Sequence, residues 1–137
     1  MFLAETPEQQ SLNLNDPLTF IGVVRKGLSK KVTDVVAEKF AITDREMAHI
    51  LKISERTFHR YKADTQLDEV ATERLLQLLK LYEYGEEVFE DLGRFKAWMR
   101  RPLGVLGNNA PFSLLDTAKG FELVNDTLMR IDYGVYA

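Results

Sequence analysis

Cysteine is absent from the 137-residue chain, and so are long apolar runs. Without cysteine there can be no disulfide, no thiol nucleophile and no thiolate zinc site. The longest apolar runs, such as residues 20–24, cover only a few residues, whereas a membrane-spanning helix needs roughly 20. The N-terminal stretch MFLAETPEQQ lacks the basic region and the apolar core of a secretory signal. We therefore expect a cytoplasmic protein without a membrane partner.

Residue patterns typical of catalysis and metal binding are also missing. The chain has no Ser/His/Asp order, no glycine-rich phosphate loop and no paired carboxylates with a reason to be buried. Its acidic cluster in residues 86–91 is more simply explained as a solvated helix face. His49 and His59 are ten residues apart and have no further ligand at metal-binding spacing. We expect no enzyme activity, no catalytic residue, no metal ion and no cofactor.

Charge is distributed unevenly along the chain, although the net charge is only −3. Residues 1–24 hold three acids and no base, and residues 25–62 hold ten Lys and Arg against five Asp and Glu, a difference of +5. Residues 63–101 hold six bases and nine acids, and residues 102–137 hold two and four. Only the middle segment is basic, so contact with nucleic acid is expected there rather than over the whole chain.

Apolar periodicity predicts an all-α fold. With 45% hydrophobic residues, the chain can bury one core or two small modules. Residues 5–17 are polar and contain two prolines, so we expect a mobile or irregularly docked arm whose end is anchored by residues 20–24. The sequence contains no convincing strand pair and no internal repeat. The expected helices span about 30–40, 43–52, 54–62, 68–85, 86–99 and 117–131, with turns between Pro102 and Pro111.

Particular residues indicate the faces and the ends of these helices. Gly85 is expected to end the fourth helix, and Gly93 is expected to interrupt the fifth. On the first helix, a single apolar stripe consists of Val32, Val35, Val36 and Phe40.

Two capping sites about ten residues apart define a tight corner between the second and third helices. Thr43 and Glu46 have the spacing of a capping box, and Ser54 can cap the following helix. Small and apolar residues at the crossing and around the turn make the corner typical of a helix-turn-helix. These framework residues are Ala48, Leu51, Ile53, Phe58 and Tyr61. Lys52 stands where the turn usually has glycine in a left-handed conformation, which a side chain disfavours by about 1 kcal/mol, so the turn should be wider or slightly strained.

The second helix of this corner is the expected DNA reader. Its N-terminal turn is the part that normally reaches base edges, and Arg56 and Arg60 share one face. An arginine can hold guanine O6 and N7 in bidentate fashion, which discriminates by roughly 1–3 kcal/mol. A purely structural corner is the alternative, and the basic excess around it favours DNA. The candidate DNA-binding residues are Ser54, Glu55, Arg56, Thr57, His59, Arg60 and Lys62.

The C-terminal half contains an ordered set of residues that resembles a known family. The set consists of Trp98, Pro102, Leu106, Gly107, Pro111, Leu114, Leu115, Thr117, Gly120, Val124, Leu128, Ile131 and Gly134. In this order it resembles the toxin-binding domain of Xre/MbcA/ParS-type antitoxins from RES-Xre toxin-antitoxin systems. The resemblance extends upstream through residues 53–60 and covers roughly residues 23–137. The arm up to Asn15 has no counterpart.

This resemblance implies an all-α antitoxin with an N-terminal helix-turn-helix domain and a small helical C-terminal domain for toxin binding and dimerisation. We expect residues 1–22 to form an arm, residues 23–84 the DNA-binding domain and residues 85–137 the C-terminal domain. The antitoxin would be a homodimer that joins its cognate RES-domain toxin, an NAD-consuming protein, in a larger hetero-oligomer. It would also repress its own operon by binding operator DNA.

The resemblance also implies that the extreme C-terminus reaches the active-site cleft of the toxin. This tail is apolar and aromatic apart from Asp132, and Arg130 lies one turn before it. The candidate toxin-binding residues are Arg130, Asp132, Tyr133, Gly134, Val135, Tyr136 and Ala137. A frayed terminus is the alternative for the tail. For the whole chain the alternative is a free-standing helix-turn-helix repressor controlled by a small molecule or another protein.

Overall fold

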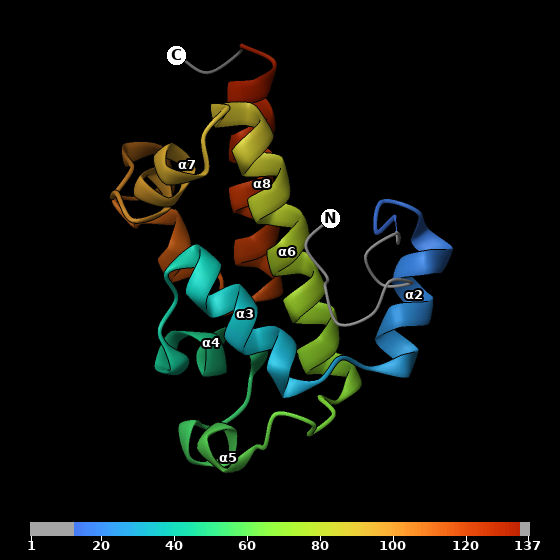
Figure 1. The fold of residues 1–137 in the computed structure, drawn as a ribbon. Coiled ribbons are helices and arrows are strands. Elements are labelled where there is room, and N and C mark those ends of the chain that lie inside the picture. The colour runs from blue at the N-terminus through green and yellow to red at the C-terminus, as the bar shows by residue number, and fades with distance from the viewer. Residues whose placement is uncertain (1–12, 135–137) are drawn as a thin grey trace. The chain divides into compact units, whose positions relative to one another are not determined.

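The computed structural model describes residues 13–134, and the regular structure in this range is helical (Figure 1). No strand forms among these residues, and strand-like pairing occurs only at the isolated bridges Ser29–Gln66 and Leu103–Asn109. The predicted all-α fold is confirmed. The chain divides between Lys80 and Leu81 into two compact units.

Within residues 13–80, the N-terminal unit has four complete helices and the first turns of a fifth. These are α2 (Pro17–Lys26), α3 (Lys30–Phe40), α4 (Asp44–Leu51), α5 (Glu55–Arg60) and the start of α6 (Glu69–Phe89). α3 has the predicted bounds. Side-chain oxygens accept hydrogen bonds from first-turn amides at the starts of α2, α4, α5 and α6, where the capping residues are Asp16, Thr43, Ser54 and Asp68.

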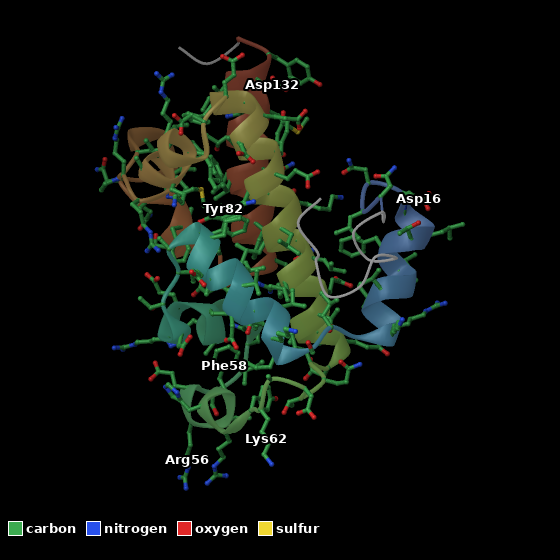
Figure 2. All side chains as sticks on the ribbon, viewed as in Figure 1. Asp16, Arg56, Phe58, Lys62, Tyr82 and Asp132 are labelled. Carbon is green, nitrogen blue, oxygen red and sulfur yellow. The ribbon has the colours of Figure 1, made fainter. Side chains whose placement is uncertain are left out.

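α2 is a helix that the sequence analysis did not predict. Asp16 caps it by accepting a hydrogen bond from the Thr19 amide at 3.1 Å, and Pro17 occupies its first position (Figure 2). Proline suits the first turn because the N–H that it lacks would have no helical partner there. The expected arm therefore ends before Pro17, and residues 20–24 lie within the helix. Residues 1–12 are outside the described residues.

The core of the N-terminal unit is built from the apolar faces of its helices. In α3, Val32, Val36 and Phe40 are buried as predicted, but Val35 remains 41% exposed. Consecutive residues are about 100° apart around a helix, so Val35 lies away from the buried side that Val36 shares with the other two. The apolar stripe is therefore narrower than predicted. Further buried side chains are Met47, Ala48, Ile50, Leu51, Phe58, Leu75, Leu76, Leu78 and Leu79.

α6 runs without interruption through Gly85, so the prediction that this glycine ends the helix is wrong. Gly85 is buried, and a Cβ atom at this position would collide with the ring of Phe95. The glycine thus admits an aromatic ring instead of stopping the helix. The helix ends at Phe89, and Glu90 follows in the left-handed conformation with φ 58°.

α7 spans Leu92–Met99, so the single helix predicted for residues 86–99 does not form. Asp91 begins α7 by accepting hydrogen bonds from the amides of Gly93 at 2.7 Å and Arg94 at 3.2 Å. Gly93 therefore lies in the first turn of a new helix, and it does not interrupt a longer one.

Two 3-10 helices and α8 complete the C-terminal unit (Figure 1). They are η1 (Gly104–Leu106), η2 (Pro111–Leu114) and α8 (Ala118–Asp132). The side-chain oxygen of Thr117 caps α8 by accepting from the Gly120 amide at 2.9 Å. A Cβ at Gly120 would collide with the carbonyl oxygen of Leu114, so glycine is what allows α8 to lie this close to η2. The turns predicted between Pro102 and Pro111 are confirmed.

An aromatic cluster holds α7 against the end of α6. The ring of Tyr82 meets that of Phe95 edge to face, with 5.0 Å between the centroids. Trp98 lies 5.5 Å from Phe89 and is stacked on Phe95 at 6.0 Å. Such pairs contribute about 0.5–1.5 kcal/mol each beyond the burial of their surface. The C-terminal unit therefore depends on rings whose close packing requires the space at Gly85.

Replacing Gly85 with alanine is expected to destabilise the protein, although alanine is the better helix former by about 1 kcal/mol. The added methyl group must displace the buried Phe95 ring, and overpacking of this kind typically costs about 1–3 kcal/mol. Gly22→Ala is the matched control, because Gly22 is also helical but has open space around it. That variant should be at least as stable as the wild type. Urea unfolding measures both, and equal stability of the two variants would contradict the packing role of Gly85.

Candidate functional site

The predicted corner is formed by α4 and α5. The Thr43 hydroxyl oxygen accepts a hydrogen bond from the Glu46 amide at 3.1 Å, and the Glu46 carboxylate accepts one from the Thr43 amide at 3.0 Å. This reciprocal pair is the predicted capping box, and it determines where α4 begins. From that start, Met47, Ile50 and Leu51 are turned into the core, as predicted.

Lys52 forms the turn between α4 and α5 in the left-handed conformation, with φ 61° and ψ 40°. Its amide donates back to the carbonyl oxygens of Ala48 and His49, and the Ile53 amide donates to the Ala48 oxygen at 3.0 Å. The turn is therefore tight, and the wider turn that was one of two expected outcomes does not form. The turn is slightly strained, which was the other expectation, because a Cβ atom disfavours the left-handed conformation of Lys52 by about 1 kcal/mol.

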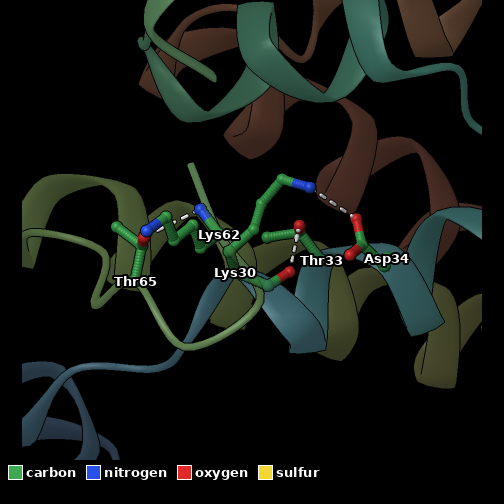
Figure 3. Close-up of polar contacts among 5 residues, drawn as sticks. All are labelled: Lys30, Thr33, Asp34, Lys62 and Thr65. Carbon is green, nitrogen blue, oxygen red and sulfur yellow. Dashed lines mark hydrogen bonds and ion pairs between the residues drawn. The ribbon is translucent and has the colours of Figure 1, made fainter. Parts of the chain in front are cut away.

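α5 is a helix of six residues and ends before the predicted limit at Lys62. Ser54 caps it by accepting a hydrogen bond from an amide of its first turn at 3.1 Å. Tyr61 has an extended backbone, so Lys62 lies in the following loop. There the Lys62 amide donates to the hydroxyl oxygen of Thr65 at 2.9 Å (Figure 3).

Phe58 anchors the inner face of α5. Its side chain is only 2% exposed, and the Tyr61 ring lies 6.2 Å from it, centroid to centroid. The ammonium group of Lys30, in the first turn of α3, lies 4.9 Å from the centroid of the Phe58 ring. It also pairs with Asp34 at 2.8 Å (Figure 3). Because the apolar side of α5 faces inward, its polar residues are turned towards solvent.

Backbone hydrogen bonds tie the loop after α5 to the start of α3. The Lys30 amide donates to the carbonyl oxygen of Thr65 at 2.8 Å, and the Lys31 amide donates to that of Ala63 at 3.0 Å. First-turn amides of a helix have no partner within the helix, so these bonds satisfy groups that would otherwise need water. They also hold in place the loop that contains Lys62.

The outer side of α5 and the loop residue next to it form an exposed basic surface, which we call the reading face. Its members are Arg56, Thr57, His59, Arg60 and Lys62. Figure 2 shows the side chains of Arg56 and Lys62 extending away from the ribbon. Within residues 13–134 the ion pairs do not involve the basic groups of this face, so the protein does not neutralise their charge. The structure thus brings most of the predicted DNA-binding residues onto one surface.

Glu55 differs from its neighbours because its carboxylate is paired within the protein. Its Oε1 atom lies 3.0 Å from Nε of Arg45 and 3.2 Å from Nε2 of His49. An ionised carboxylate can only accept, so Nε2 of His49 is the donor. No such contact of Arg45 or His49 is predicted by the sequence. Their spacing of four residues on one helix was the available signal, but it does not reveal a partner beyond the turn.

A hydrogen bond fixes the last turn of α8, where the predicted toxin-binding residues begin. The Tyr84 hydroxyl donates to Oδ2 of Asp132 at 2.8 Å. Burial, together with this hydrogen bond and the negative charge of Asp132, raises the pKa of Tyr84 to about 12. The hydroxyl therefore keeps its proton at physiological pH. The stabilisation that this contact gives the folded protein is lost only in strong alkali, as the pH rises from about 10 to about 12.

Arg130 and Tyr133, on either side of Asp132 in the sequence, are open to solvent. Arg130 is exposed in the last turn of α8, and Tyr133 is 74% exposed. Gly134 follows with φ 68°, a conformation that favours glycine. The remaining predicted tail residues, Val135, Tyr136 and Ala137, lie outside the described residues.

Residues 13–134 contain neither a cluster of metal-ligating side chains nor a helix that could span a membrane. No group of three or more His, Cys, Asp or Glu side chains in this range could hold a metal ion. No helix in the same range is both long enough and apolar enough to cross a membrane.

Comparison with known proteins identifies both halves of the chain. A model described as the antitoxin Xre-like helix-turn-helix domain matches residues 19–80, and one described as the antitoxin Xre/MbcA/ParS C-terminal toxin-binding domain matches residues 85–134. The predicted helix-turn-helix and the family resemblance are confirmed.

Curated relatives agree with these two matches. The chain is 29% identical over 131 residues to the Prs ADP-ribosylating antitoxin of Sphingobium sp. (strain YBL2), covering 88% of this chain and 82% of the relative. It is 27% identical over 116 residues to antitoxin Xre of Yersinia enterocolitica, covering 83% and 78%. A further antitoxin Xre, from Photorhabdus laumondii, is 25% identical over 117 residues, covering 82% and 78%. These relatives are named as antitoxins and not as enzymes.

Proposed function

The chain belongs to the Xre/MbcA/ParS family of antitoxins, and we propose that it inhibits a RES-type, NAD-consuming toxin and represses its own operon as a homodimer. One observation carries this proposal: a helix-turn-helix with an exposed basic reading face and a toxin-binding domain occur in the same chain. A free-standing repressor would have no need of the second domain. Operator DNA and NAD are both cytoplasmic, which is where we propose that the protein acts.

Operator binding is proposed to use the reading face. Arg56 and Arg60 are the base-reading side chains, because a guanidinium group matches guanine O6 and N7. Lys62, in the adjoining loop, supplies a phosphate contact, and Thr57 and His59 lie between these basic groups. A homodimer would carry two α5 helices roughly 34 Å apart, one turn of DNA, so that modest contacts to two half-sites combine on a palindrome.

The assignment of a RES-type toxin rests on the family and on the name of one relative. That relative, from Sphingobium, is named as a Prs ADP-ribosylating antitoxin. An ADP-ribosyl group is taken from NAD, so the name fits a system in which the toxin consumes NAD. The proposed complex is a hetero-oligomer that contains the antitoxin homodimer and the toxin.

Toxin inhibition is proposed to involve Arg130 and the tail of residues 132–137. The hydrogen bond from Tyr84 holds Asp132, so the tail leaves the protein from a defined point. Tyr133 exposes most of its surface, which suits an aromatic side chain that becomes buried in a pocket of the partner. Arg130 is exposed one turn earlier and can pair with a toxin carboxylate.

Expression of the gene that neighbours this one tests the toxin assignment. We expect the neighbouring protein to arrest growth and to lower cellular NAD, and we expect co-expression of this antitoxin to reverse both effects. Light scattering of the purified antitoxin checks the homodimer. Growth arrest with an unchanged NAD level would contradict the RES assignment while leaving the antitoxin assignment in place.

The double variant Arg56→Ala/Arg60→Ala should lose operator binding and keep toxin neutralisation. Each bidentate contact to guanine contributes roughly 1–3 kcal/mol, so the loss of two such contacts should lower the affinity at least about thirtyfold. Arg94→Ala/Arg101→Ala, which removes two exposed arginines from the C-terminal unit, is the charge-matched control and should bind the operator normally. Wild-type affinity should also fall steeply with salt. Loss of growth rescue in the Arg56/Arg60 variant would contradict the separation of the two functions.

A chain that ends at Asp132 should neutralise the toxin less well and still bind the operator. The truncation keeps Asp132 and its contact with Tyr84, and it removes the rest of the tail, residues 133–137. Leu123→Ala, which shortens an exposed apolar side chain elsewhere on α8, is the control and should rescue growth like the wild type. Growth rescue and operator affinity are measured in parallel. Full rescue by the truncated chain would move the inhibitory contact to another surface.

A further inference from the structure

A polar contact that we call the Glu55 clamp joins the two helices of the corner. In it, the Glu55 carboxylate meets Arg45 at 3.0 Å and His49 at 3.2 Å, and both basic groups contact the same oxygen, Oε1. Glu55 is the first residue of α5, whereas Arg45 and His49 lie on α4. The clamp therefore spans the turn at Lys52.

α5 needs such contacts because it is too short to be stable alone. Isolated helices of fewer than about 12 residues are marginal in water, and α5 has six. Phe58 holds the middle of the helix, and the loop that is tied to the start of α3 holds its C-terminal end. The Glu55 clamp holds the N-terminal end, where the residues that reach base edges begin. The next residue along the helix is Arg56.

The same contacts argue against direct base reading by Glu55. A glutamate can accept a hydrogen bond from cytosine N4, but Oε1 of this carboxylate is paired with Arg45 and contacts His49, and both partners hold the side chain towards α4. The guanidinium group of Arg45 is likewise directed at Glu55. Without these partners, a carboxylate on the reading side of α5 would repel DNA phosphates.

We infer that Glu55, Arg45 and His49 are positioning residues, which set the orientation of α5 on α4 so that Arg56 and Arg60 meet the operator together. The inference rests on the proposed operator binding. It assigns Glu55 to the geometry of the reading face instead of to base recognition. It also adds two residues of α4 to those on which operator recognition depends.

A double-mutant cycle of Glu55→Ala and Arg45→Ala tests this inference through operator affinity. Each single substitution should weaken binding about two- to fivefold, the scale of an exposed ion pair, and the double variant should bind no more weakly than Glu55→Ala. Loss of a negative charge near DNA would by itself strengthen binding. Asp44→Ala is the matched control because it removes an exposed acid from the first position of α4, and it should bind as well as the wild type or slightly better.

Two further measurements separate positioning from direct contact. The base preference at each operator position should be unchanged in Glu55→Ala. The salt dependence should be unchanged in Arg45→Ala, since loss of a phosphate contact lowers its slope by about 1. Arg45→Lys, which keeps the positive charge, should recover part of the affinity. Additive effects in the cycle, tighter binding by Glu55→Ala, a lost base preference or a lowered salt slope would each overturn the inference.

Hydrogen exchange in the free protein makes the test independent of operator binding. The amides of residues 58–60 should exchange faster in Glu55→Ala and Arg45→Ala than in Asp44→Ala, because the clamp no longer holds α5. Unchanged exchange would overturn the inference. If the wild type fails to bind its operator while exchange changes as expected, the proposed operator function fails and the positioning role of Glu55 remains.

Discussion

Burial of Phe58 is the interaction on which the reading face of this protein depends. A helix of six residues has too few internal hydrogen bonds to persist alone, and full burial of a phenylalanine side chain contributes about 1.5–3 kcal/mol. Lys30 lies over the ring and the following loop is tied to the start of α3, so the inner side of α5 is held firmly. Arg56 and Arg60 are exposed because the apolar side of their helix is occupied.

Close approach at two glycines has a comparable role in the C-terminal unit. Gly85 leaves room for the Phe95 ring, and Gly120 leaves room for the carbonyl oxygen of Leu114. At these two glycines α7 packs tightly against α6, and η2 packs tightly against α8, because no Cβ atom separates them. The hydrogen bond between Tyr84 and Asp132 joins α6 to the last turn of α8, where the proposed toxin-binding tail begins.

The sequence predicted those features of the corner that depend on neighbouring residues. Thr43 and Ser54 act as caps through bonds to amides three residues away, so their spacing alone indicates where α4 and α5 begin. Pro17 and Gly85 were misleading because each residue type has two roles. Proline can end a helix or begin one, and glycine can stop a helix or admit a neighbouring side chain. The choice between these roles depends on surroundings that the local sequence does not contain.

By itself, the sequence determined the all-α class, the capped corner, the basic middle segment and the family resemblance. These properties follow from composition, from residues within a turn of one another, and from the order of residues along the chain. Only the tertiary structure decided that Glu55 meets Arg45 and His49, and that Tyr84 meets Asp132 across 48 residues. The physical reason is that such contacts depend on the angle and the distance at which helices pack. Those quantities result from the burial of many side chains together, and no local pattern specifies them.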